Sequence, residues 1–560
     1  MTVHDFDVVV VGAGIAGSMV AYRLAQAGAG VLILEAGSHN PSRSRMVGSY
    51  ATAFPKSLHS PYINPESDLK APSPDSSADY YVQPDAKTHT QFLSTYERRT
   101  GGSTWHWLGH TPRLLRSDFR MRKMYGGRRD FPPGFVDWPI TYDDLEPWYC
   151  EAENEMGVAG SDEEWKNVFN SPRSKPFPMS KIWPSYSDNW IAKRINGKSL
   201  DGVSYLVKST PAARNSTMYD GRPACAGNSI CVPLCPIGAK YDGSVHVRKA
   251  TGAGASLWEQ CVVTKLEKDK NNAVHTVHFV TYGGVRRTVT AEIVVIAAHA
   301  IETPKLLLMS GLANSSDKVG RYLMDHLSKS MYGLAPEPLF PFRGPPSTSG
   351  IESFRDGVFR KERAGFRVSL NNDGWSRKSA PYAEIIDLVV NRKLIGKRLQ
   401  LELFEKISRQ VRLSCSVEVA PDANNRVELS TETDSLGLPR PKITFTPPEY
   451  SYKGLRQAIK TIKHMFGLIK ATDVDLGMPK AYDGAGHIMG TCRMGNDSRS
   501  SVVDAHSRTH DHKNLFVVGS SVFPTVGSPN PTLTIAALAL RAAKDIAAQL
   551  GAKTSRRNQA

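Results

Sequence analysis

The chain has 560 residues, 70 of them basic and 54 acidic, which is too long for one ordinary hydrophobic core and predicts at least two structural units. No window approaches 18 uninterrupted apolar residues, and MTVHDFD leads directly into an apolar run, so we expect neither a membrane span nor a signal peptide. The net charge of +16 is scattered, which favours a solvated basic surface over nucleic-acid binding, although it also suits an anionic substrate or membrane face.

The stretch 7–37 contains a short apolar run, a glycine loop, a helical pattern and a second apolar run. Gly12, Gly14 and Gly17 have the G-x-G-x-x-G spacing, and Glu35 follows the second run. Gly12 permits a tight turn, Gly14 lets a pyrophosphate approach the backbone, and Gly17 allows the helix to pack on the strand. A glycine motif alone also fits an ordinary turn. With strand, helix and acid in register, it predicts a dinucleotide site whose ribose hydroxyls are bound by Glu35.

The following segments predict a second unit of another kind. Residues 38–87 are rich in Ser, Pro and Asp, which indicates a long surface excursion. Residues 138–157 have helical spacing and predict a helix against the cofactor unit. Alternating patterns between 332 and 483 predict an antiparallel sheet that carries a substrate domain. Further strands and helices like those of the stretch 7–37 are also expected. They are strands 262–266, 274–280, 293–297 and 514–518, a helix after Pro304 and an Ala/Leu-rich helix at 531–550.

Three of the seven cysteines, Cys225, Cys231 and Cys235, fall within eleven positions. Three thiolates without a fourth suit a three-iron cluster. Zinc is the alternative metal, but no histidine is nearer than His246 and the C-x2-C spacing is absent. A set of three buried thiols without metal is the remaining possibility. The other cysteines are isolated and are predicted to be packing residues: Cys150, Cys261, Cys415 and Cys492.

Several stretches together resemble the glucose–methanol–choline (GMC) family of FAD oxidoreductases. They are the opening loop, GGSTWHW, ETPKLLLMSG, VGRYLMDH and the tail from His487 to Asn530. Within the family, WHW, ARNSTMYDGRPAC and CPIGAKY are typical of bacterial membrane-bound sugar and sugar-acid dehydrogenases. The segments WHWLGHTPRL, DWPITYDDLEPWYC and GTCRMG are most similar to those of gluconate 2-dehydrogenase flavoproteins.

The resemblance implies an α/β plus antiparallel β fold, with a Rossmann-like FAD-binding domain and a discontinuous substrate domain. The expected FAD-binding domain comprises 1–50, 90–135, 200–330 and 485–560, with an iron–sulfur loop at 222–238. The expected substrate domain comprises 51–89, 136–199 and 331–484.

The resemblance also implies the functional residues. His487 is the expected base and Asn530 orients the substrate hydroxyl, where other members carry a second histidine. Asn530 also reads as the N-cap of the last helix, ahead of Pro531. His106 is the expected covalent 8α-histidyl link to FAD, with a histidine stacked between tryptophans as the alternative. FAD contacts are expected from Gly12, Gly14, Ala16, Gly17, Glu35, Ala36, Gly101, Gly102, Ser103, Thr104, Val263, Gly519, Ser520 and Asn530.

The implied activity is FAD-dependent oxidation of D-gluconate to 2-keto-D-gluconate, with Arg493 as the candidate cation for the carboxylate. Fructose, sorbitol, glucose and 2-ketogluconate stay open as substrates, as does a flavin subunit without its own chemistry. The resemblance implies that a [3Fe-4S] cluster bound by the three cysteines passes electrons onward. The implied partners are a small subunit with a twin-arginine signal and a membrane-anchored multihaem cytochrome c, at the periplasmic face of the inner membrane.

Overall fold

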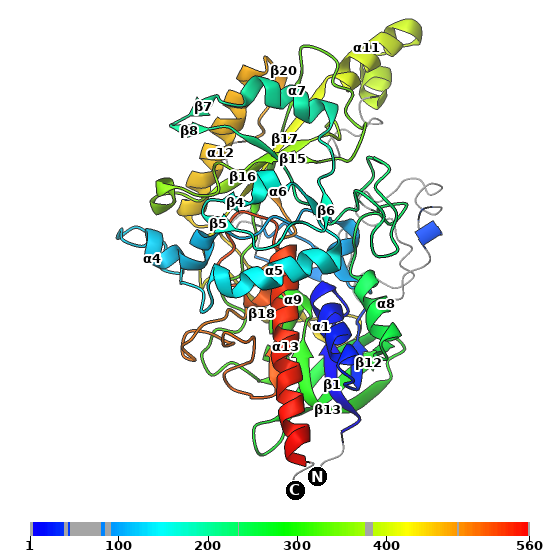
Figure 1. The fold of residues 1–560 in the computed structure, drawn as a ribbon, viewed down its shortest axis with the longest axis vertical. Coiled ribbons are helices and arrows are strands. Elements are labelled where there is room, and N and C mark those ends of the chain that lie inside the picture. The colour runs from blue at the N-terminus through cyan, green and yellow to red at the C-terminus, as the bar shows by residue number, and fades with distance from the viewer. Residues whose placement is uncertain are drawn as a thin grey trace.

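The structure is a computed structural model that describes residues 4–37, 43–44, 47, 80–84, 91–232, 234–375, 385–478 and 481–557. The surface excursion predicted at 38–87, and with it most of the expected domain segment 51–89, lies outside these ranges. Two seven-stranded sheets follow one another along the long axis of the molecule, one toward each end (Figure 1). None of the described helices is long and apolar enough to cross a membrane.

The first sheet has a parallel layer in the order β10-β2-β1-β13, with β22 on the other side of β13. Its strands are β1 (Phe6–Val11), β2 (Val31–Leu34), β10 (Ser256–Trp258), β13 (Arg286–Ile296) and β22 (Leu515–Val517). The N-terminal half of β13 instead pairs antiparallel with β12 (Val274–Thr281), which continues to β11 (Cys261–Lys268). The apolar runs of the parallel strands are fully buried.

Three helices pack together around the parallel layer: α1 (Ile15–Gln26), α8 (Ser244–Gly252) and α13 (Thr532–Arg557). Helix α5 (Tyr142–Met156) packs on α13, so the segment 136–199 that we expected in the substrate domain contributes this helix to the first core. Helix α9 (His299–Ser310) begins before Pro304, not after it as predicted, because the strand β13 ends at Ile296 and the chain turns at once.

The second sheet is antiparallel, as the alternating patterns predict, and runs in the order β20-β14-β17-β16-β15-β9, with β21 also on β14. Its strands are β9 (Val207–Ser209), β14 (Leu327–Leu334), β15 (Ser349–Ile351), β16 (Phe366–Asn371), β17 (Gln410–Val417), β20 (Thr472–Asp475) and β21 (Asp483–Gly484). Helix α12 (Glu449–Leu468) covers the apolar face of this sheet. The other face is polar and borders the main cavity.

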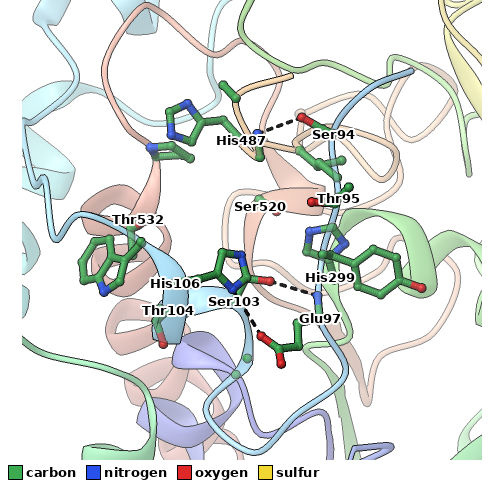
Figure 2. Close-up of a pocket in the computed structure, with 18 of the residues that line it drawn as sticks. Ser94, Thr95, Glu97, Ser103, Thr104, His106, His299, His487, Ser520 and Thr532 are labelled. Carbon is green, nitrogen blue, oxygen red and sulfur yellow. Dashed lines mark hydrogen bonds and ion pairs between the residues drawn. The ribbon is translucent and has the colours of Figure 1, made fainter. Parts of the chain in front are cut away.

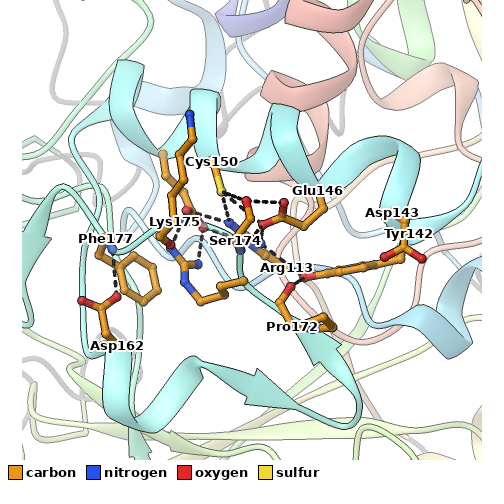
Figure 3. Close-up of polar contacts among 12 residues, drawn as sticks. Arg113, Tyr142, Asp143, Glu146, Cys150, Asp162, Pro172, Ser174, Lys175 and Phe177 are labelled. Carbon is orange, nitrogen blue, oxygen red and sulfur yellow. Dashed lines mark hydrogen bonds and ion pairs between the residues drawn. The ribbon is translucent and has the colours of Figure 1, made fainter.

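A buried ion cluster fixes α5 to its neighbours (Figure 3). Arg113 and Arg173 each donate two hydrogen bonds to the Glu153 carboxylate, at 2.7–2.9 Å. Cys150 is part of this cluster, since its Sγ donates to Glu146 at 3.1 Å, so it is more than the packing residue that we predicted. Removal of one partner would leave a buried charge unpaired, which makes the cluster a clamp on the helix.

Candidate active site

A cavity of about 1340 Å³ extends from the carboxyl ends of β1 and β2 to the polar face of the second sheet. Ligands of doubly wound sheets bind at such strand ends. Most of the predicted site residues line this cavity, although they come from four separate parts of the chain. They are Gly12, Gly14, Ala16, Glu35, Ala36, Gly101, Gly102, Ser103, Thr104, His106, Val263, His487, Gly519, Ser520 and Asn530.

The glycines of the first turn differ in the space around them. A Cβ on Gly12 would lie 2.7 Å from the Ala297 oxygen, and Gly12 has φ +104°. A Cβ on Gly17 would lie 2.0 Å from the Gly12 oxygen, so Gly17 serves helix–strand packing and does not line the cavity. A Cβ on Gly14 would meet no protein atom within 4 Å. The space at Gly14 is therefore open to a pyrophosphate at the start of α1.

Glu35 ends β2 with its carboxylate held in place by the backbone. Its oxygens accept hydrogen bonds from the Ala13 and Gly37 N–H groups, each at 2.6 Å. Burial raises the pKa of Glu35, and these two hydrogen bonds act against that rise. The carboxylate is thus preorganised beside the glycine turn, where we predicted it to bind ribose hydroxyls.

The 3₁₀ helix η1 (Gly102–His106), with Gly101 as its N-cap, lies against the glycine turn. Gly101 donates its N–H to the Ala13 oxygen at 2.9 Å, and a Cβ on Gly102 would lie 3.2 Å from the Gly14 Cα. His106 Nδ1 lies 3.2 Å from a Glu97 oxygen (Figure 2). Burial alone would raise the pKa of Glu97, but the hydrogen bond with His106 and the Arg99 charge lower it overall. His106 therefore faces the cavity beside an ionised carboxylate.

His487 and Asn530 meet at the end of the cavity nearest the second sheet. The Asn530 amide nitrogen donates to His487 Nε2 at 2.9 Å. Helix α13 begins at Thr532, two residues after Asn530, and the Asn530 side chain bonds to the histidine as the family resemblance implies. Burial lowers the pKa of His487 well below its usual value, and the neighbouring His326 lowers it further. His487 is thus neutral at ordinary pH.

A third residue, His326, sets the tautomer of His487. Its Nε2 lies 2.9 Å from the Gly527 carbonyl, which can only accept, so His326 carries its proton on Nε2. Burial lowers the pKa of His326 to about 4, which keeps the ring neutral and leaves Nδ1 as an acceptor. The 2.9 Å contact between the two Nδ1 atoms then requires His487 to donate. His487 Nε2 consequently presents a lone pair toward Asn530.

The backbone at His487 is fixed by the residue before His326. Asp325 accepts hydrogen bonds from the His487 N–H at 2.9 Å and from the Ala485 N–H at 3.1 Å. The Ser94 hydroxyl donates to the same carboxyl. Burial raises the pKa of Asp325 to about 6. Asp325 and His326 end the segment VGRYLMDH, to which we assigned no role from the sequence. An acid followed by a histidine directly before an alternating strand was the signal that could have indicated one.

The polar face of the second sheet forms the wall opposite the glycine turn. Alternate residues of three strands point into the cavity, because side chains in a strand alternate between the faces. They are Ser328, Ser330 and Tyr332 of β14, Arg367, Ser369 and Asn371 of β16, and Arg412, Ser414 and Ser416 of β17. This wall of hydroxyl groups was also missed, although serine at every second position was a visible signal.

Each cation among the described residues of the cavity wall already has a carboxylate partner. Arg412 forms an ion pair with Asp373, with 2.6 Å between Nη2 and Oδ2, and Arg367 forms one with Glu352, with 2.5 Å between Nε and Oε1. Three more pairs complete the set: Arg98 with Glu302, Arg99 with Glu97 and Lys305 with Glu302. The wall is therefore polar but balanced in charge.

Arg493 does not reach this cavity. Its Nε donates to the Ser500 carbonyl at 2.9 Å, and its guanidinium stacks 3.7 Å from the Tyr322 ring centroid. Arg493, which we expected to bind a substrate carboxylate, thus has a structural role in the loop after β21. It is only six residues from His487 in the sequence, but its side chain does not line the cavity that His487 lines.

The three clustered cysteines lie beside the cavity. Their loop contributes Ser229, Ile230 and Val232 to the wall. Cys231 and Cys235 are buried and Cys225 is half-buried, and within the described residues no group of three His, Cys, Asp or Glu side chains is arranged to hold a metal ion. The thiols of Cys235 and Cys225 are close enough to add to the burial that raises the pKa of the Cys231 thiol, so the three lie near one another without the arrangement of a single-ion site.

Comparison with known proteins agrees with this geometry. The chain matches the model for GMC oxidoreductases at 206–328 and 421–539, and the model for FAD dependent oxidoreductases at 7–106. It is 36% identical to the fructose dehydrogenase large subunit of Gluconobacter japonicus, over 96% of this chain and 97% of that protein. The chain belongs to the GMC oxidoreductase family.

Other members of the family are more distant. The gluconate 2-dehydrogenase flavoprotein of Pantoea cypripedii is 23% identical, over 97% of this chain and 94% of that one. The crystal structure of pyridoxine 4-oxidase from Mesorbium loti superposes with a TM-score of 0.61 at 19% identity, over 97% of this chain and 99% of that one. As a GMC oxidoreductase, the chain uses FAD and acts on CH–OH donors. The open space at Gly14 and the long cavity fit that cofactor.

Proposed function

We propose that this GMC oxidoreductase is a dehydrogenase of a neutral sugar such as fructose, rather than of gluconate, which the sequence alone favoured. The observation that carries this choice is the charge balance of the cavity wall, where Arg412 is held by Asp373 and Arg367 by Glu352. A substrate carboxylate would need a cation without such a partner, and Arg493 lies elsewhere. The similarity to a fructose dehydrogenase large subunit supports the same choice.

Bound FAD would supply the hydride acceptor, with Gly12 to Glu35 holding its nucleotide end and the 101–106 segment also lining its cavity. The protein's part in the chemistry is proton removal. Neutral His487 presents its Nε2 lone pair, and a substrate hydroxyl that donates to it comes within reach of the Asn530 amide, which now occupies that lone pair. Helix α13 begins at the cavity and adds the positive end of its dipole there.

The serine-rich wall fits the remaining hydroxyls of a sugar. Ser416 also lines this wall, but its Oγ is buried and has no hydrogen-bond partner among the described residues. Ser330, Ser414 and Ser369 each accept one hydrogen bond from a neighbouring Arg or Asn, which orients the rest of their hydrogen-bonding capacity. Such a wall binds neutral polyhydroxyl compounds without burying an unpaired charge.

Steady-state kinetics with an artificial electron acceptor test this proposal. We expect kcat/KM for fructose, sorbitol or glucose to exceed that for gluconate and 2-ketogluconate by about tenfold or more, the scale of one lost polar interaction. In Asp373→Asn the freed Arg412 should shift the ratio toward gluconate. Asp483→Asn, which removes another carboxylate of the wall, is the control. Preference of the unmodified enzyme for gluconate would overturn the choice.

A flavin subunit without its own chemistry is the alternative of another class. The ordered His326–His487–Asn530 chain argues for catalysis, because an electron carrier has no use for a proton acceptor. Loss of flavin absorbance on anaerobic addition of a sugar supports the enzyme. No bleaching with any polyol or sugar acid would favour the electron carrier.

Covalent FAD and a cluster are two further proposals for the same protein. The covalent link at His106 is supported by its place in the cavity wall. The [3Fe-4S] cluster at Cys225, Cys231 and Cys235 is supported only by the cysteine spacing and by the position of the loop beside the cavity. Flavin that stays with acid-precipitated protein tests the first proposal, and iron content with an EPR spectrum tests the second.

We also propose that the chain works in a complex with a small twin-arginine-signal subunit and a membrane-anchored multihaem cytochrome c, at the periplasmic face of the inner membrane. The support is that a relative is named as a large subunit. Export of this chain in the absence of the small subunit would contradict the proposal.

A further inference from the structure

A helical hairpin projects from the edge of the second sheet. It comprises η4 (Asp387–Asn391), the two residues before it and α11 (Gly396–Ser408), and we call residues 385–408 the hairpin. It lies at the far end of the molecule from the C-terminal end of α13 (Figure 1). Helix α11 packs against η4, and Ser408 is its one buried residue.

The hairpin exposes an unusual amount of apolar surface. Seven of the 21 large apolar side chains that the described residues expose lie in it, whereas such residues are otherwise scattered. They are Ile385, Ile386, Val389, Val390, Ile395, Leu401 and Phe404. Ile395, at the turn between the two helices, is 78% exposed. The hairpin buries little apolar surface of its own, since Leu388 and Leu394 are its buried apolar side chains. A concentrated apolar patch of this kind marks an interaction site.

Exposed cations surround the apolar tip. Lys393 precedes Ile395 by two residues, and Lys397 and Arg398 follow it; all three are exposed, and none has an ion-pair partner in the described part of the chain. Arg392 is paired with Glu402 within the hairpin, and Glu405 is paired with Arg409 directly after it. The charge left free at the tip is therefore positive.

We propose that the hairpin docks this protein on an anionic lipid surface, with Ile395 and its aliphatic neighbours entering the headgroup region. Interfacial helices combine an apolar face with Lys and Arg at the boundary, which is the composition of the hairpin. A protein partner is the less suitable occupant, because protein interfaces are depleted of lysine, which supplies two of the three free cations at the tip. Of the residue types enriched there, Tyr, Trp, Phe, Met and Arg, the hairpin has only Phe404, Arg392 and Arg398.

The connection to the cavity gives this contact a defined orientation. Helix α11 ends at Ser408 and β17 begins at Gln410, so Arg412 of the cavity wall is four residues from the end of the hairpin. Docking through the hairpin would place the second sheet next to the lipid surface and the nucleotide end of the cavity farther from it.

Vesicle cosedimentation of the full-length, FAD-loaded chain tests the proposal. We expect binding to vesicles with 30% phosphatidylglycerol in phosphatidylcholine, little binding to pure phosphatidylcholine, and release at high salt. The triple variant Lys393→Ser, Lys397→Ser, Arg398→Ser should lower the affinity about fivefold per cation, the effect of on the order of 1 kcal/mol for each. Ile395→Ser with Leu401→Ser should weaken binding as well.

Matched variants separate the hairpin from general surface effects. Lys166→Ser, Lys175→Ser, Lys198→Ser removes three exposed lysines elsewhere, and Trp183→Ser removes an apolar side chain that is 80% exposed. Both controls should bind vesicles like the original chain, and all variants should keep sugar oxidation with a soluble acceptor. Equal binding by the hairpin and control variants would overturn the proposal. So would an absence of vesicle binding, or a dimer in gel filtration that the hairpin variants abolish.

Discussion

At the scale of single residues, the base owes its reactive form to a neighbour. A histidine can act as a proton acceptor only through the ring nitrogen that has no proton. His326, fixed by the Gly527 carbonyl, makes His487 carry its proton on Nδ1 and leaves Nε2 as the acceptor, which the Asn530 amide now occupies. His326 is therefore a positioning residue in the proposed mechanism, in which His487 and Asn530 contact the reacting hydroxyl.

Substitution of His487 separates chemistry from cofactor binding. We expect His487→Ala to lower kcat by about 10²–10⁴-fold, the usual contribution of a general base, and to keep its flavin. Single-turnover reduction of the flavin measures this effect directly. A loss of less than tenfold would mean that the base lies elsewhere.

The role of His326 has a signature in the pH profile. In His326→Leu the Nδ1 acceptor is lost, and we expect kcat to fall about 10²-fold because the base is no longer oriented. The acid limb of kcat/KM should also move to higher pH, because His326 helps to lower the pKa of His487. His326→Gln, whose amide can accept from His487 and donate to Gly527, should restore much of both properties. Identical profiles for the two variants would contradict the tautomer argument.

At the scale of elements, the first turn of the chain makes two separable contributions. Gly17 permits α1 to lie against the turn, since a Cβ there would be 2.0 Å from a backbone oxygen, while Gly14 faces only open space. Strand–helix packing and cofactor binding thus depend on different glycines of one motif.

Two alanine variants test this separation. We expect Gly17→Ala to lower the free energy of unfolding by about 1–3 kcal/mol or more, as overpacked sites do. Gly14→Ala should keep the thermal stability of the FAD-free protein within about 0.5 kcal/mol, typical of a neutral surface change, but lose flavin. Differential scanning calorimetry and the flavin absorbance after purification measure the two effects. The reverse pattern would refute the assignment.

At the scale of the whole molecule, buried carboxylates hold the units together and make the fold acid-sensitive. Ion pairs and hydrogen bonds lower the pKa of Glu146, Glu155 and Glu302 to about 2, although burial alone would raise it. Their partners include Arg113 for Glu146, His246 for Glu155 and Arg98 for Glu302. Each pair joins segments distant in sequence.

The sign of the acid effect follows from proton uptake. Below pH 4.5, the ordinary pKa of Glu, the unfolded chain binds protons that the folded chain does not. The free energy of unfolding therefore decreases as the pH is lowered from about 4.5 to about 2. The slope is up to about 1.4 kcal/mol per pH unit for each group. Denaturant titrations at several pH values should show a shallower slope in Glu302→Gln than in the original chain. An unchanged slope would exclude Glu302 as a contributor.

Sequence reasoning reached some parts of this molecule and not others, for physical reasons. The glycine turn and Glu35 are local, because strand, turn and helix follow one another within 30 residues. The His487–Asn530 pair was reached through the family resemblance and is brought together by the fold. The serine wall and the pairing of Arg412 with Asp373 depend on which strands become neighbours in the second sheet. The error with Arg493 has the same origin, since spacing along a loop does not fix the side on which a side chain emerges.

The chain order of the first sheet has a consequence for synthesis. Strand β1 needs β13 beside it, and β22 and the His487–Asn530 pair come from the last 75 residues. Between Ile296 and His487 a ribosome working at roughly 5–20 residues per second needs about 10–40 s. For that time the growing chain holds a nearly complete nucleotide-binding end and no base. Premature termination before residue 487 therefore yields a product that lacks the proton acceptor, whatever flavin it retains.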